Sequence, residues 1–231
     1  MKRKLQHICK NLICFVYCMK MKMCELIDPY RVRAKRYFRC LKFIKLLHVL
    51  SFGKSRFYEC SSLLRILDCL SLNTDLSVGI EFPDEETLGD TSKLYLFRDI
   101  MPEDRIYALS DNIMVENSEM GVWHFYLLMS SVHFLPLWDH AVSMDRKFIA
   151  SRRQLIFTGH EYSGTDDLRP FVNLTKTSEN SSESILSACY WSEWGGLFRE
   201  TYRLVINDNH VKIFERISDD CLLEYHCHIM L

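Results

Sequence analysis

The C-terminal string CLLEYHCHIML (residues 221–231) holds the side chains best suited to bind a metal. Side chains two positions apart on a β-strand project to the same face, so Glu224, His226 and His228 are expected to form a row. Carboxylates and imidazoles are ligands for zinc and iron. We therefore consider a metal site of these three residues, with His210 as a fourth member because the expected strand pairing places it opposite His228.

Basic side chains on the same predicted face argue against a divalent cation. Lys212 is expected opposite His226, and Arg203 and Arg216 lie nearby. These three cations suit an anion-binding patch instead, because Arg and Lys form charge-assisted hydrogen bonds to carboxylates and phosphates. We favour a third interpretation, in which the polar residues form the solvated face of a strand and bind nothing.

Two other segments have compositions that occur in sites and in ordinary turns or sheets. Segment 158–167 gathers acids, a histidine and a serine around a glycine: His160, Glu161, Ser163, Asp166 and Asp167. Such a loop can bind a cation or transfer protons, but turn-forming residues give the same composition. The string CYWSEWGGLFRE (189–200) offers aromatic rings for a ligand wall, and a hairpin uses the same rings for cross-strand packing. We interpret both segments as structural.

Several common catalytic and cofactor-binding motifs are absent from the sequence. It contains no C-x-x-C, G-x-x-x-x-G-K-[ST] or G-x-G-x-x-G, so the usual zinc, redox, P-loop and dinucleotide signatures are missing. It also lacks G-x-S-x-G, so the pair Asp139 and His140 has no support as part of a hydrolase triad. The sequence therefore identifies no cofactor.

Residues 30–50 give the clearest helix signal. Apolar and aromatic side chains follow helical spacing along one face: Tyr30, Ala34, Tyr37, Leu41, Ile44 and His48. Pro29 precedes them, at a position that helix starts tolerate. The helix also carries seven cations: Arg31, Arg33, Lys35, Arg36, Arg39, Lys42 and Lys45. Aromatic residues among these cations suit contact with nucleic acid or with an anionic membrane surface.

The charge is divided sharply along the chain. Residues 1–56 contain fifteen Lys or Arg and two acids, whereas residues 57–231 contain fourteen basic and twenty-eight acidic residues. A basic arm of this kind binds an external polyanion, an anionic membrane or the acidic part of its own chain.

The remaining elements follow from apolar spacing and turn residues. We predict a second helix over 56–72, a boundary in the acidic linker 81–92, a strand over 94–100 and a helix over 116–135. Segment 174–184 is expected to be a polar surface loop. Residues 1–80 are then a basic, Cys-rich helical segment, and residues 81–231 form an acidic α+β domain.

The C-terminal third predicts an antiparallel meander. A turn at 207–210 pairs Ile206 with Val211, and a second turn at 218–220 pairs Ile217 with Cys221. The register places apolar side chains on one face: Tyr202, Leu204, Ile206, Val211, Ile213, Ile217, Cys221, Leu223, Tyr225, Cys227 and Ile229. Agreement over three strands favours an α+β fold with helix packed on this face of the sheet.

The N-terminal segment and the cysteines bear on location. Residues 1–23 resemble a signal peptide in charge and apolar run, but they lack a small-residue cleavage site; a later translation start near Met19–Met23 is the other explanation. The apolar run is too short to span a bilayer. Ten cysteines in a chain of this length, several among core-type residues, indicate reduced thiols in the cytoplasm.

The leading hypothesis is a non-enzymatic binding protein whose basic helix contacts an anionic partner. The alternative is a small metal-dependent enzyme centred on Glu224, His226 and His228.

Overall fold

The computed structural model describes residues 28–50, 57–72, 75–82, 93–97, 106, 109–134, 138–139, 142–143, 146–156, 159–193 and 195–225. Helices and antiparallel sheets make up the fold, and a helix precedes the strands, which confirms the predicted α+β class. Within this part of the chain, no helix is long and apolar enough to cross a membrane.

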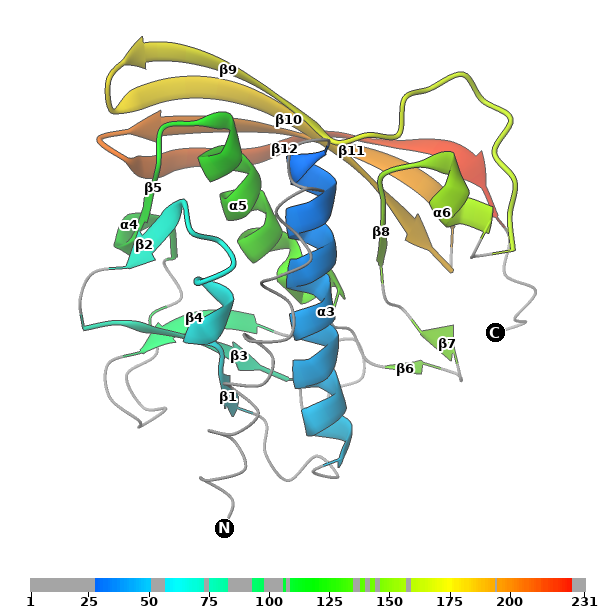
Figure 1. Ribbon diagram of the computed structural model, residues 1–231, viewed down its shortest axis with the longest axis horizontal. Helices are drawn as coiled ribbons and strands as arrows, with labels where there is room; N and C mark the ends of the chain where they lie inside the picture. The colour runs from blue at the N-terminus through cyan, green and yellow to red at the C-terminus, as the bar shows by residue number, and fades with distance from the viewer. Residues whose placement is uncertain are drawn as a thin grey trace.

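A large sheet and a small sheet lie on either side of a helical layer (Figure 1). The main sheet has the order β2-β5-β12-β11-β10-β8, with β9 also paired to β10; a small sheet has the order β1-β3-β4, and β6 pairs with β7. Their bounds, in chain order, are α3 Pro29–Leu50, β1 Phe57–Glu59, η1 Ser61–Leu63, β2 Leu70–Leu72, β3 Ser77–Glu81, β4 Lys93–Phe97, α4 Leu109–Asn112, β5 Ile113–Val115, α5 Glu119–Ser130, η2 Ser131–Phe134, β6 Trp138–Asp139, β7 Val142–Ser143, β8 Lys147–Ile149, α6 Arg152–Ile156, β9 Phe171–Ser178, β10 Ser181–Ser192, β11 Gly196–Asn207 and β12 His210–Glu224.

Helix α3 begins and packs where its sequence pattern predicts. The Asp28 carboxylate accepts a hydrogen bond from the Arg31 backbone N–H at 3.0 Å, which satisfies one of the free donors of the first turn. Ala34, Tyr37 and Leu41 are buried in the main core. The predicted helix over residues 30–50 is therefore confirmed.

Helix α5 lies between α3 and the main sheet. The Ser118 hydroxyl caps it by accepting from the Gly121 backbone N–H at 3.0 Å. On one side, the Trp123 indole N–H donates to the Tyr30 carbonyl of α3 at 3.0 Å. On the other side, the rings of Tyr126 and Tyr202 lie 5.6 Å apart, which joins the helix to β11. Together with η2, α5 confirms the helix predicted over 116–135.

The helix predicted over residues 56–72 is wrong. This segment instead forms β1, the short η1 turn and β2. The backbone N–H of Cys60 donates to Val78 of β3 at 2.8 Å, and Leu70 of β2 pairs with Val115 of β5. The spacing of Leu63 and Leu67 is compatible with a helix, but both side chains are buried in turns between β1 and β2. These strands pair with β3 and β5, which lie later in the chain, and that pairing overrides the local preference.

The polar loop predicted over 174–184 is also wrong, because β9 and β10 form a hairpin there. Its turn is held by Asn117, whose side-chain amide N–H groups lie 2.8 Å from the Glu179 carbonyl and 3.3 Å from those of Ser178 and Ser181. A tertiary contact thus stabilises a strand pair whose Ser- and Thr-rich sequence predicts a loop.

Strand β12 confirms one predicted turn and contradicts the other. Ile206 pairs with Val211 as predicted, across a tight turn in which Asp208 and Asn209 have φ of 49° and 60°. No turn interrupts residues 218–220, because β12 continues to Glu224 along β11.

The predicted apolar face is correct only near the first turn. Tyr202, Leu204, Ile206 and Val211 are buried, whereas Ile213 and Ile217 are 37% and 52% exposed. Register shifts along β11 and β12 change which residues oppose each other, so that Leu204 lies opposite Phe214 instead of Ile213.

A charged network is buried under α5. Glu200 of β11 is inaccessible to solvent and accepts hydrogen bonds from the hydroxyls of Tyr126 at 2.5 Å and Tyr202 at 3.3 Å. Arg146 forms an ion pair with the same carboxylate at 3.1 Å, and its guanidinium lies 4.0 Å from the centre of the Tyr190 ring. Burial raises the pKa of Glu200. The carboxylate therefore depends on these donors inside the core.

Replacing Glu200 by alanine should lower the unfolding free energy by about 3–5 kcal/mol, because it leaves Arg146 and two tyrosine hydroxyls without their acceptor. Glu200→Gln retains an acceptor oxygen and should cost less. Urea unfolding of the three proteins measures both values, and an alanine variant within about 1 kcal/mol of the wild type would contradict this assignment.

His133 should make the protein sensitive to mild acid. Burial, reinforced by the positive charges of Arg146 and Arg216, lowers its pKa to about 4. The unfolded chain binds a proton on this residue near pH 6.5, so the unfolding free energy should fall as the pH drops from about 6.5 toward 4 and should not depend on His133 above that range. Urea unfolding between about pH 5 and 7.5 should show a shallower fall for His133→Gln; identical pH profiles would disprove it.

Candidate functional site

The exposed side chains of α3 follow a single line along the helix. Within the described residues of α3 they are spaced by helical steps on the face opposite the core: Lys35, Arg39, Lys42, Leu46 and Leu50. We call these five residues the α3 stripe. Three cations occupy its first half and two leucines its second half, and α3 contains no acidic residue.

The other predicted cations of α3 are partly exposed: Arg31, Arg33, Arg36 and Lys45. Arg33 turns away from the stripe, because its guanidinium donates to the Ile66 carbonyl at 3.1 Å and pairs with Asp68 at 3.1 Å. The structure therefore presents Lys35, Arg39 and Lys42 most openly.

The predicted metal ligands are not gathered into one site by the described strands. His210 and Glu224 are the first and last residues of β12, about 45 Å apart along a continuous strand. The turn predicted at 218–220 places His210 opposite His228, but β12 runs through these residues without a turn. His226 and His228 lie outside the described residues, so a metal site formed by them with Glu224 stays a prediction.

The predicted anion patch is divided between the two faces of the sheet. Arg216 lies opposite Tyr202, whose side chain is buried toward α5, whereas Arg203 is the next residue on β11 and projects to the other face. Arg203 pairs with Glu183 at 2.7 Å, and Arg216 pairs with Asp219 at 2.8 Å. With Lys212 exposed further along β12, the three cations do not form a single patch.

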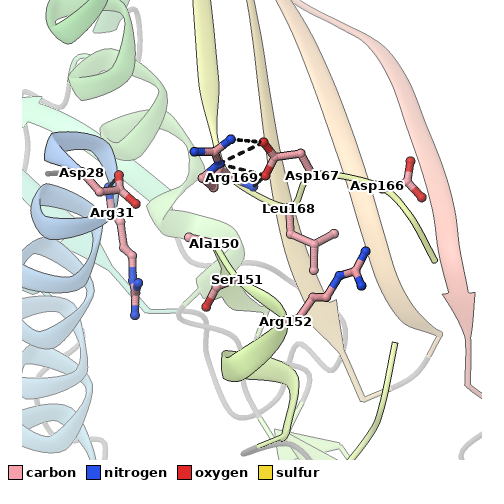
Figure 2. Close-up of a pocket in the computed structure, with 9 residues that line it drawn as sticks. All are labelled: Asp28, Arg31, Ala150, Ser151, Arg152, Asp166, Asp167, Leu168 and Arg169. Atoms are coloured by element: carbon pink, nitrogen blue, oxygen red, sulfur yellow. Dashed lines mark hydrogen bonds and ion pairs between the residues drawn. The ribbon is translucent and has the colours of Figure 1, made fainter. Parts of the chain in front are cut away.

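Two of the three acids in the 158–167 loop are already paired with arginines. Asp166 contacts Arg199 at 3.2 Å, and Asp167 contacts Arg169 at 2.6 Å. Figure 2 shows the latter pair among the residues that line a hollow of about 260 Å³. The hollow is lined by Asp28, Arg31, Ala150, Ser151, Arg152, Asp166, Asp167, Leu168 and Arg169. These pairings favour the structural interpretation of the loop over a cation site.

The aromatic string at 189–200 packs the sheet. Trp191 is fully buried in a second core cluster, and the rings of Tyr190 and Phe198 stack across β10 and β11 at 5.4 Å. His160 stacks on Trp191 at 4.3 Å instead of facing the neighbouring acids. Cross-strand packing therefore accounts for these rings, as predicted.

The structure brings together a cluster that sequence reasoning missed. Ligand-type atoms of Asp68, Cys69 and His124 lie within 4.8 Å of one another. Asp68 and Cys69 occupy the turn before β2, and His124 is a fully buried residue of α5. The one sequence signal is a histidine in a mostly apolar helix; its two neighbours are 55 and 56 residues away in the chain, so spacing does not reveal them.

The electrostatics of this cluster oppose a nucleophilic cysteine. Burial raises the pKa of the Cys69 thiol to about 12, with Glu116 and Asp68 adding to the effect. Burial also lowers the pKa of His124 to about 4. The thiol and imidazole are thus both neutral near pH 7, whereas an activated cysteine needs a thiolate beside an imidazolium.

Comparison of the chain with protein-family models, curated proteins and solved structures finds no match.

Cys69 should accordingly react slowly with alkylating reagents. In metal-free protein near pH 8, the exposed Cys221 should be labelled by iodoacetamide at least about tenfold faster than Cys69, whose thiolate population is small. Peptide mass spectrometry over a time course measures both rates. Preferential labelling of Cys69 would instead support a catalytic cysteine.

Proposed function

We propose that this protein is a non-enzymatic binding protein whose α3 stripe contacts an anionic membrane surface. The observation that carries the proposal is the order of side chains on the stripe: three cations, Lys35, Arg39 and Lys42, are followed in line by two exposed leucines. A partner that matches this order offers negative charge and an apolar region side by side.

The core holds the stripe in a fixed position. Ala34, Tyr37 and Leu41 on the opposite face are buried, so α3 cannot turn without exposing them. From Lys35 to Leu50 the stripe extends about 22 Å along the helix axis. The three cations span about 10 Å of this length. Because the helix holds them in line, they contact neighbouring lipid headgroups at the same time, which makes their contributions additive.

Leu46 and Leu50 favour a lipid surface over nucleic acid. They are 50% and 64% exposed, and burying leucine side chains in the acyl boundary releases free energy that a phosphate backbone does not provide. The cytoplasmic leaflet carries anionic lipids, which agrees with the location that the reduced cysteines predict. The protein would then bind the membrane from the cytoplasm without spanning it.

The test is sedimentation of the full chain with phosphatidylcholine vesicles, with or without phosphatidylserine. Lys35→Gln/Arg39→Gln/Lys42→Gln should weaken binding to the anionic vesicles about 100-fold, at about 1 kcal/mol for each cation. The matched control is Lys93→Gln/Lys176→Gln/Lys212→Gln, which removes three exposed cations from the sheets and should bind almost as the wild type does.

A second variant separates lipid from nucleic acid. Leu46→Gln/Leu50→Gln should reduce vesicle binding while leaving any salt-dependent retention on DNA unchanged. Failure of the intact protein to sediment with anionic vesicles contradicts the proposal. Tight DNA binding that the stripe cations control and the leucines do not affect would assign the stripe to nucleic acid instead.

A further inference from the structure

Three segments come close together at one place: the turn before β2, the residue after β5 and helix α5. Each carries a side chain of a kind that binds metals. We propose that Asp68, Cys69 and His124, with the Glu116 carboxylate as fourth ligand, bind a divalent transition metal of the zinc class. Thiolate, imidazole and carboxylate together are ligands that zinc accepts. This inference is independent of membrane binding by the α3 stripe.

The spacing of the atoms is close to that of a metal site. The Asp68 Oδ1 atom lies 3.7 Å from His124 Nδ1 and 4.0 Å from Cys69 Sγ. A tetrahedral zinc ion with bonds of about 2.0–2.3 Å holds its ligand atoms roughly 3.3–3.8 Å apart. Both separations that involve Asp68 are already near that range. The separation between Cys69 Sγ and His124 Nδ1 is at most 4.8 Å, so the Cys69 side chain has to move by roughly 1 Å.

His124 is held in place by the fold and directs one nitrogen at the cluster. Its side chain is fully buried on α5, and its Nδ1 atom accepts a hydrogen bond from the Cys69 backbone N–H at 3.2 Å. Metal binding exchanges this hydrogen bond for a metal–nitrogen bond at the same atom. The ring needs no large movement because Nδ1 already faces residues 68–69.

Glu116 supplies the fourth ligand from a neighbouring position. Its backbone N–H donates to the Cys69 carbonyl at 2.9 Å, which fixes the two residues side by side. The negative charge of its carboxylate adds to the raised pKa of the Cys69 thiol, which places it near that residue, and the exposed side chain has to turn to join the other three ligand atoms. All four ligands then come from the protein, as in structural zinc sites, in which no position is left open for a substrate.

The charges around the cluster call for a cation. Two carboxylates, those of Asp68 and Glu116, face a single guanidinium, that of Arg33, which is 3.1 Å from Asp68. With Cys69 as thiolate the set carries three negative charges and one positive charge, so a divalent ion makes it neutral. Such an ion would also tie β2, β5 and α5 together and stabilise the folded chain.

The test uses the full chain, purified without a histidine tag and stripped with a chelator, then titrated with Co²⁺ as probe. The expected result is one cobalt per chain, with a thiolate-to-cobalt charge-transfer absorption that zinc abolishes by displacement. Cys69→Ser should lose this absorption and bind cobalt at least about tenfold more weakly, whereas Cys221→Ser should match the wild type.

Asp68 is exposed, so replacing it should not prevent folding. Asp68→Asn should weaken cobalt binding by at least about tenfold, and the matched control Asp75→Asn, another exposed acid, should not. Far-UV circular dichroism verifies that each variant is folded. The proposal is overturned if the intact protein binds no cobalt, or if Cys69→Ser keeps the charge-transfer absorption. It is equally overturned if His226→Ala/His228→Ala alone abolishes the absorption, since the metal then sits at the C-terminal string.

Discussion

Burial of α5 is the constraint on which the rest of the structure depends. Nine of its twelve residues are buried, including all those from Gly121 to Leu128. A helix that is apolar around its circumference is stable only when other elements cover every side. α3 covers one side through Trp123, and the main sheet covers another through Phe125 and Tyr126. The arrangement of helices and sheet in Figure 1 follows from this requirement.

Both proposed sites are consequences of that packing. α3 covers α5 and the adjoining core with Ala34, Tyr37 and Leu41, so the opposite face of α3 must carry its cations and two leucines toward solvent. The same packing places the buried His124 beside the turn at residues 68–69, next to the carboxylate of Asp68 and the thiol of Cys69. One site thus uses a face that the core leaves outside, and the other uses a polar residue that the core encloses.

Several charged side chains of the main sheet are paired within the protein. In the core, Glu200 is paired with Arg146 and two tyrosines; on the sheet surface, Arg203 is paired with Glu183 and Arg216 with Asp219. Exposed ion pairs of this kind add little stability, but each pair is close to neutral, so its cation attracts an anionic ligand only weakly. The α3 stripe differs in composition, because its helix contains cations and no acidic residue.

The sequence by itself determined the elements whose signal is local. Helical spacing located α3, and a mostly apolar stretch of helix length without proline located α5. Alternation with a tight turn gave the pairing of Ile206 with Val211. Tertiary structure decided the rest. Partners distant in the chain drew Phe57–Glu59 and Leu70–Leu72 into strands, and Asn117 stabilised the β9–β10 turn. β12 continued through the Ser-Asp-Asp at 218–220 because β11 pairs with it there. The site at Asp68, Cys69 and His124 belongs to the second class. Periodicity reports which face of an element is buried, whereas only packing brings together side chains that are far apart in the chain.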